Sequence, residues 1–242
     1  MGSFDRDDGE RAGDHVDRIE QDATERDEDE TMIDAGMATG LIEKLLDVGI
    51  DGKGRFDSAQ HVADTALAEH PEPGAAIDKI SSQHLRLAAA GGFVTGLGGL
   101  VTMTVALPAN VVGFYLLATR AVAAIASVRG YDIRRPEVRS AVLLALVGAD
   151  ADDLLKKAGL SGGGRLANFA VERLPGPVLM AVNKGVGFRL MTQVGKKTLA
   201  RFGKAVPVLG GVVGAGLDTY LLKRILDHAK HEFPPKTHVL TR

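Results

Sequence analysis

The chain has 242 residues, and 45% of them are hydrophobic, which is enough apolar surface to build a substantial core. It contains no cysteine, so disulfides and thiolate metal sites are excluded, and the lack of tryptophan argues against an integral membrane protein with interfacial aromatic belts. The net charge of −2 conceals two segments of opposite charge.

The acidic segment comes first. Residues 1–34 contain 14 Asp and Glu residues and 4 arginines, a net charge of −10. We predict a disordered acidic tail, because charge repulsion and few apolar side chains leave its ordering entropy uncompensated. Two roles are open for the tail: a solubilising extension, or an arm that interacts with a partner or with the basic segment 156–204, whose net charge is +9. No secretory signal is recognisable, so a cytoplasmic location is expected.

Apolar residues at helical spacing predict two helices after the tail. The first begins near Met32 and ends at Gly49 and Gly52, because glycine is a common helix stop. Asp57 is the expected N-cap of the second helix, which stops before Pro71.

The most unusual segment is an uncharged run, residues 87–119, rich in glycine, alanine and threonine. A third helix enters it, Pro108 is expected to break it, and a fourth helix continues beyond the proline. Glycine inside a helix costs about 0.5–1 kcal/mol relative to alanine, so these glycines imply a packing or bending role. We predict a glycine-rich helical hairpin that crosses the bilayer, dips into it, or lies buried in a soluble bundle.

Further helix signals follow in the second half of the chain. Pro136 with Glu137 marks a helix start, Asp150 is the expected cap of the next helix, and Gly159 is its stop. A flexible connector at 161–164, a basic helix and a final apolar segment complete the pattern. Strand alternation is absent from the sequence, so we predict an all-α multi-helix bundle. The expected division is a tail at 1–34, a helical domain at 35–235 and a C-terminal tail at 236–242.

Small residues recur four apart in two segments, the uncharged run and residues 205–217. This spacing places them on one helix face, which allows two helix backbones to approach closely. We expect the two faces to be each other's partners, with Gly92, Gly96, Gly99, Gly210 and Gly214 as the helix-packing residues. Asp218 follows the second face and is expected to be an ordinary surface aspartate, with a polar contact to the partner backbone as the alternative.

The basic helix at 187–205 is amphipathic. Its apolar stripe is predicted to contain Phe188, Met191, Gly195, Leu199 and Phe202. The opposite side gathers the residues predicted to meet an anionic membrane surface, namely Arg189, Lys196, Lys197, Arg201 and Lys204. In the alternative interpretation these cations are solvated while the stripe packs on the bundle. No aromatic platform or recognition motif accompanies the charge, so nucleic acid is not an expected partner.

The sequence contains only weak signals for catalysis, phosphate binding or metal binding. Gly195-Lys196-Lys197-Thr198 lacks the earlier glycine of a phosphate-binding loop, and no Ser/His/Asp set can be assembled. His84 is expected to be a core or capping histidine. We predict a protein that is not an enzyme and holds no cofactor or metal, and we keep a metal-dependent enzyme using His228 and His231 as an alternative.

Several glycine motifs, taken in order, resemble the EcsC family over about residues 60–233. They are Gly92-x-x-Thr95-Gly96-x-Gly98-Gly99, Pro108, Gly130-Tyr131-Asp132, Pro207-x-x-Gly210 with Gly214, and Ala229-x-x-x-Phe233. In that family the later glycine segment is usually followed by asparagine, where this chain has Asp218. The family takes its name from a protein encoded beside the components of an ABC transporter, so the resemblance implies a link to such a transporter, and it carries over no catalytic residue.

Together these features predict a helical protein on the cytoplasmic face of the membrane, peripheral or partly inserted through the hairpin and the basic helix. An accessory or interaction role is expected, with the anionic membrane surface and a membrane protein or transporter component as partners. The alternative is a soluble helical bundle whose glycine faces line a pocket for a lipid or other apolar ligand.

Overall fold

The computed structural model of the protein describes residues 36–54, 56–97, 99–161, 164–202 and 207–236, with side chains described outside 93–110 and 193–213. In these ranges every regular element is a helix, so the predicted all-α class is confirmed. The predicted acidic tail at 1–34 lies outside the described residues, as does 237–242.

The chain begins with helical backbone at 36–44 that continues into a π-helical turn, η1 (Leu45–Ile50). The elements that follow in order are α2 (Ala59–Glu69), α3 (Pro73–Leu97), α4 (Gly99–Val128), α5 (Pro136–Val147), the 3₁₀ turn η2 (Gly148–Asp150), α6 (Ala151–Lys157), α7 (Leu166–Val171), α8 (Gly176–Phe202) and α9 (Pro207–Glu232).

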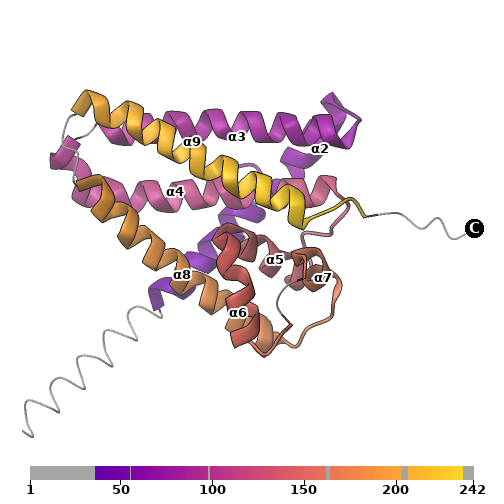
Figure 1. The fold of residues 1–242 in the computed structure, drawn as a ribbon. Coiled ribbons are helices and arrows are strands. Elements are labelled where there is room, and N and C mark those ends of the chain that lie inside the picture. Colours follow the sequence, from indigo (N-terminus) through magenta and orange to yellow (C-terminus); the bar gives the residue numbers. More distant parts are fainter. Residues whose placement is uncertain (1–35, 55, 98, 162–163, 203–206, 237–242) are drawn as a thin grey trace, which may run out of the picture.

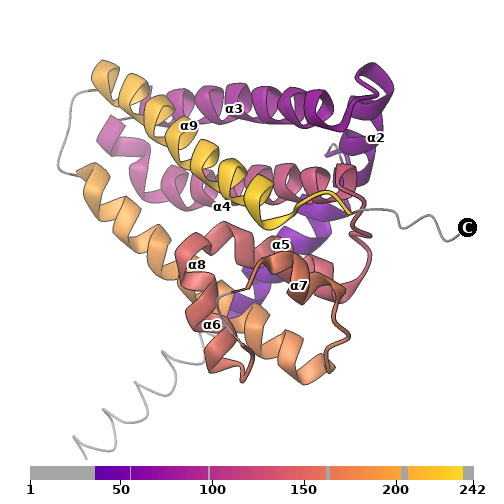
Figure 2. The same ribbon diagram turned by 45° about the vertical axis from the view of Figure 1, so that its right-hand side comes forward.

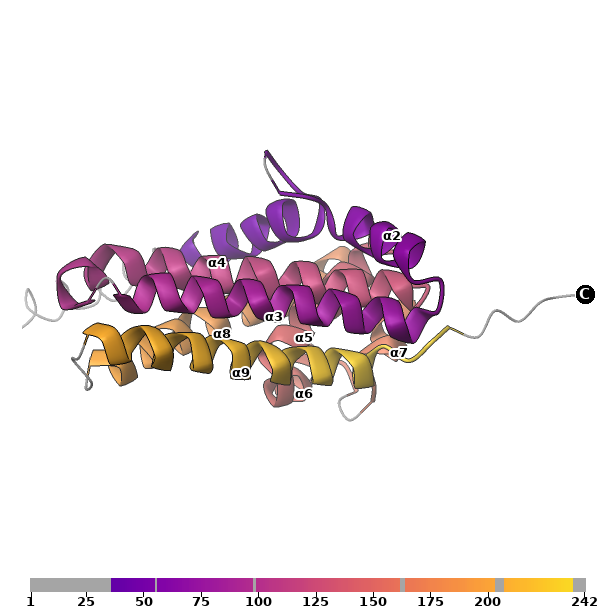
Figure 3. The ribbon, with the colours of Figure 1, turned by 90° about the horizontal axis from the view of Figure 1, so that it is seen from above.

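Helix α4 is the centre of the fold. It packs against α3 and α9 on one side and against α2 and η1 on another, as Figures 1 and 3 show. From Ala121 to Ala126 its side chains are fully buried, and Leu143 and Leu144 of α5 are equally buried beside it. An apolar helix covered on all sides in this way is the core of the bundle.

Local signals explain several helix ends. Ser58 rather than Asp57 caps α2, because its Oγ accepts the backbone N–H of His61 at 3.1 Å. Helix α5 begins with Pro136 as predicted. Helix α6 ends before Gly159, whose φ of +78° suits glycine.

The predicted helix break at Pro108 is wrong. Helix α3 ends at Leu97 and α4 begins at Gly99, so Pro108 lies inside α4. A proline in a helix interior costs about 3 kcal/mol through one lost N–H and a clash with the preceding turn. Helix α4 continues beyond Pro108 to Val128 through the buried core, and this packing stabilises the helix as a whole.

Candidate functional site

Four helix ends lie together at one end of the molecule. These ends lie on the left in Figures 1 and 2 and remain there in the view from above (Figure 3). They are the end of α3, the start of α4, the end of α8 and the start of α9. We call residues 93–97, 99–110, 193–202 and 207–213 the hairpin end. The uncharged run and the basic helix, about a hundred residues apart in sequence, therefore reach the same end of the bundle.

At the base of the hairpin end, α3 crosses α9 at Gly92 and Gly214. A Cβ atom on Gly92 would lie 2.6 Å from the carbonyl oxygen of Gly214, and one on Gly214 would lie 2.5 Å from that of Gly92. The structure thus brings together one residue from each of the two small-residue faces. The other expected helix-packing positions, Gly96, Gly99 and Gly210, fall in the segments whose side chains are not described.

Asp218 lies at the same crossing, one turn after Gly214. Its side chain is only 4% exposed, so the expectation of a surface aspartate is wrong. A Cβ atom on Gly92 would lie 2.8 Å from its Oδ2 atom, which places the carboxylate against the α3 backbone. The spacing of four between Gly210, Gly214 and Asp218 is the sequence signal that could have placed this aspartate on the packed face.

Helix α8 carries the predicted membrane-surface residues. The side chain of Arg189 pairs in a bidentate manner with Asp150, with both nitrogen-to-oxygen distances at 2.6 Å, and this hydrogen bonding raises the pKa of the Arg189 guanidinium. Its charge is therefore engaged within the protein. The backbone at Lys196, Lys197 and Arg201 is helical, but their side chains are not described, and Lys204 lies outside the described residues.

The buried side of α8 also differs from the predicted stripe. Val182, Val186 and Leu190 are buried at spacings of four, whereas Phe188 is exposed and lies near Lys184, with the ammonium 5.9 Å from its ring centroid. Within the predicted stripe, Phe188 is therefore exposed and Met191 is packed against the core, while Gly195, Leu199 and Phe202 lie where side chains are not described. On α8 the 36–44 segment makes a close contact at Gly187, where a Cβ atom would lie 2.7 Å from the carbonyl oxygen of Ala38.

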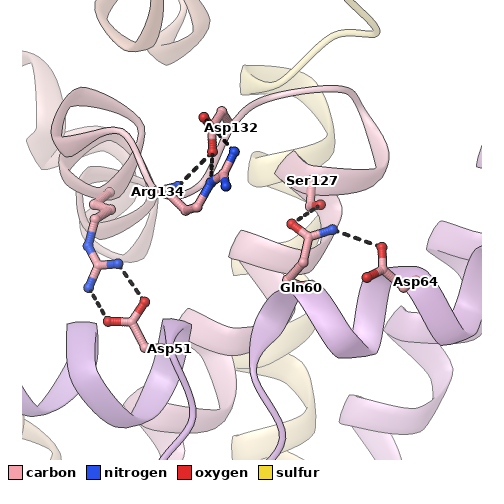
Figure 4. Close-up of polar contacts among 7 residues, drawn as sticks. Asp51, Gln60, Asp64, Ser127, Asp132 and Arg134 are labelled. Carbon is pink, nitrogen blue, oxygen red and sulfur yellow. Dashed lines mark hydrogen bonds and ion pairs between the residues drawn. The ribbon is translucent and has the colours of Figure 1, made fainter.

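A cavity of about 620 Å³ lies between η1, α2 and the turn after α4. Figure 4 shows that its polar side chains engage one another. Arg134 donates to both carboxylate oxygens of Asp132, at 2.9 and 3.3 Å, and these contacts lower the pKa of Asp132. The Gln60 amide accepts from Ser127 at 3.0 Å and donates to Asp64 at 2.8 Å. Because these side chains already form hydrogen bonds and an ion pair with one another, the arrangement is suited to holding structural elements together more than to catalysis.

The second ion pair beside this cavity joins distant segments. Arg139 of α5 donates to both oxygens of Asp51, at 2.6 and 2.7 Å, and so links α5 to the loop after η1. A planar guanidinium facing a carboxylate fixes orientation as well as distance.

The motif Gly130-Tyr131-Asp132 has a structural role that the sequence did not reveal. Gly130 adopts a φ of +88° and lets the chain turn after α4. The Tyr131 ring then contacts Phe233 edge to face, at 5.3 Å between centroids, and its hydroxyl donates to the Pro234 carbonyl oxygen at 3.1 Å. Two motif elements about a hundred residues apart therefore dock the end of α9 against the turn.

His228 and His231 line a smaller cavity of about 210 Å³ together with Glu232. The Glu232 carboxylate accepts the backbone N–H of Leu166 at 2.8 Å, so it caps the start of α7. Its other oxygen is 3.1 Å from His231 Nδ1 and 3.9 Å from His228 Nδ1. Within the described ranges, no three or more His, Asp or Glu side chains are arranged to hold a metal ion.

His84 is a core histidine, as expected. Its ring is 4% exposed, and its Nδ1 atom lies 2.8 Å from the carbonyl oxygen of Ile80 in the preceding turn. Burial lowers the pKa of His84, and the nearby Arg120 lowers it further, whereas the contact with Ile80 raises it. The imidazole is therefore held in its neutral form inside the bundle.

Among the described residues, one helical segment, Val111–Val128, is long and apolar enough to cross a membrane. Most of it (67%) is buried inside the protein, and a central core helix has the same length and composition. This segment therefore gives little support for a membrane span.

Comparison with known proteins gives one match. The EcsC protein family matches residues 37–234, which is most of the chain and includes every described helix from η1 to α9. Neither a curated protein nor a solved structure matches the chain. The chain therefore belongs to the EcsC protein family.

Proposed function

We propose that this protein binds the anionic cytoplasmic face of the membrane through its hairpin end and acts there as a non-enzymatic accessory protein. The observation that carries the proposal is the meeting of the uncharged run and the basic helix at one end of the bundle (Figure 1). A membrane protein or a transporter component is the class of partner that we propose, in keeping with the family resemblance.

The two parts of the hairpin end complement each other at a lipid surface. Residues 93–110 contain no charged side chain, so their insertion would bury no ion in hydrocarbon. Residues 193–204 carry four cations, and no acidic residue occurs between Arg173 and Leu217. Each Lys or Arg close to an anionic surface contributes about 1 kcal/mol to binding, while apolar insertion adds a contribution that salt does not screen.

The lengths of the helices favour insertion into one leaflet over a crossing. Helix α3 continues for five residues beyond Gly92, which is about 8 Å, and α9 has seven residues before Gly214, which is about 10 Å. The hydrocarbon core of a bilayer is about 30 Å thick. Since α3 and α9 touch at these two glycines, the part of the bundle beyond them is too short to span it.

The absence of tryptophan from the sequence provides a direct test. A single tryptophan introduced as Leu100→Trp reports on the hairpin end, and Tyr220→Trp, at an exposed position on α9, is the matched control. With phosphatidylglycerol vesicles, we expect brominated acyl chains to quench the fluorescence of Leu100→Trp and leave that of Tyr220→Trp unchanged. Equal fluorescence of Leu100→Trp with and without vesicles would contradict the proposal.

The alternative ligand pocket between the glycine faces has less support. At the described crossing, Gly92 and Gly214 touch through their backbones and leave no space for an apolar molecule between them. The metal-dependent enzyme also has less support, because Glu232 is engaged in capping α7.

A further inference from the structure

An apolar groove of about 490 Å³ lies on the outer side of α4, away from the polar cavity of Figure 4. It is lined by Val48, Phe56, Val112, Gly113 and Leu116, with Lys44 and Lys53 as the charged residues. Its volume falls within the range of about 300–1,000 Å³ that is typical of small-molecule sites.

The groove is open because of a glycine in the middle of α4. A Cβ atom on Gly113 would meet nothing within 4 Å, although glycine in a helix interior weakens the helix relative to alanine. Nearby, η1 and α4 touch closely: a Cβ on Gly49 would lie 3.0 Å from the Thr119 side chain. The free space is thus confined to the side of α4 that carries Gly113.

One wall of the groove is a fixed aromatic ring. Phe56 is 52% exposed, which is unusual for a large apolar side chain held in a defined position. The Arg120 guanidinium lies 5.0 Å from its ring centroid and donates to the Val48 carbonyl oxygen at 3.4 Å. Arg120 therefore holds two parts of the lining together and keeps the ring in place.

The charged residues at the groove are two lysines. Lys44 and Lys53 are both exposed, and Lys53 pairs with Asp47 of η1. Because Asp47 already matches the charge of Lys53, Lys44 is the ammonium group that makes the apolar floor complementary to a molecule with one anionic headgroup and one hydrocarbon chain. We propose that the groove binds a single-chain anionic amphiphile of the fatty-acid class, with its chain against Val112, Gly113 and Leu116 and its carboxylate near Lys44.

This proposal does not depend on membrane binding, so it is tested without vesicles. The probe is cis-parinaric acid, a fluorescent fatty acid, added to the full-length protein below its micelle-forming concentration. Each CH₂ group displaced from an apolar site weakens binding by about fourfold, so Gly113→Leu, which fills the floor, should weaken binding by about tenfold or more. Gly216→Leu is the matched control, because Gly216 is also an exposed helical glycine with nothing within 4 Å of its Cβ position.

The headgroup is tested with the methyl ester of the same probe. Lys44→Gln should weaken binding of the acid severalfold and leave binding of the ester unchanged, whereas Lys53→Gln should weaken binding of the acid less, because Asp47 already pairs with Lys53. Equal binding of the acid by Gly113→Leu, by Gly216→Leu and by the unaltered protein would overturn the proposal. Melting curves confirm that each variant is folded.

Discussion

Gly92 of α3 and Gly214 of α9 meet at one helix crossing, where the carbonyl oxygen of each occupies the place of a Cβ atom on the other. The two oxygens lie 2.6 and 2.5 Å from those Cβ positions, a separation that real Cβ atoms essentially never show. Neither helix can keep this spacing with any residue larger than glycine.

We expect Gly92→Ala and Gly214→Ala each to lower the free energy of unfolding by about 1–3 kcal/mol, the usual cost of overpacking. Gly216→Ala on the same helix is the control, because its Cβ would meet nothing within 4 Å. That change should raise stability by about 0.5–1 kcal/mol through helix propensity. Urea unfolding measures all three variants, and equal effects at the three positions would argue against a close crossing.

Sequence patterns predicted the features that depend on local spacing. The all-α class follows from apolar periodicity, which is a property of short windows. The helix start at Pro136 and the stop at Gly159 follow from the preferences of single residues. The break at Pro108 was predicted by the same logic and is wrong, because a long helix whose later part is buried in the core can retain a proline nearer its start.

The parts of the site that sequence did not predict depend on distant neighbours. Arg189 pairs with Asp150, which belongs to a different helical element, and the burial of Asp218 depends on the approach of α3. The contact between Tyr131 and Phe233 joins two motifs whose separation in sequence gives no sign of their contact. Periodicity places a residue on a face of its own helix, but it does not say which other helix covers that face.

A second prediction concerns Tyr131. Tyr131→Phe removes the hydrogen bond to the Pro234 carbonyl and keeps the edge-to-face contact with Phe233, so we expect a loss of about 0.5–1.5 kcal/mol in unfolding free energy. Phe233→Ala removes a fully buried ring and should cost about 3–5 kcal/mol. The same hydroxyl deletion at exposed Tyr220 is the control and should have no measurable effect.

A third prediction is a pH dependence of stability that originates at His84. Burial lowers its folded-state pKa below the value of about 6.5 in an unfolded chain, so the unfolded state binds the proton more readily. The contribution of neutral His84 to stability is complete above about pH 6.5 and is lost as the pH falls toward the folded-state pKa.

Unfolding by urea at about pH 7.5 and about pH 5.5 brackets this window. We expect His84→Gln to reduce the loss of stability between the two pH values, although it lowers stability at both. His61→Gln on the exposed face of α2 should leave the loss unchanged. The same pH dependence in all three proteins would assign it to other groups.

A fourth prediction concerns residues 1–34. Their net charge of −10 and few apolar side chains leave little to pack on the bundle, so their deletion should leave the melting temperature unchanged at low salt. A drop of several degrees that disappears at high salt would instead show that the tail binds the basic segment 156–204.

The last prediction separates the two contributions at the hairpin end. Replacing Lys196, Lys197 and Arg201 with glutamine removes three charges, each worth about 1 kcal/mol near an anionic surface, so binding to phosphatidylglycerol vesicles at low salt should weaken by up to about a hundredfold. At 1 M salt the Debye length falls to about 3 Å, so the variant and the unaltered protein should bind alike through the apolar run.

Replacing Lys156, Lys157 and Arg173 with glutamine changes the net charge equally at exposed positions on the α6 and α7 side of the molecule, away from the hairpin end (Figure 1). This control should keep nearly full binding at about 0.1 M salt, where the Debye length is about 10 Å, because its charges lie away from the hairpin end. Equal weakening of the two triple variants would show that net charge, and not the position of the cations, governs binding. Complete release of the unaltered protein at 1 M salt would show that residues 93–110 do not enter the hydrocarbon, and attachment would then be electrostatic alone.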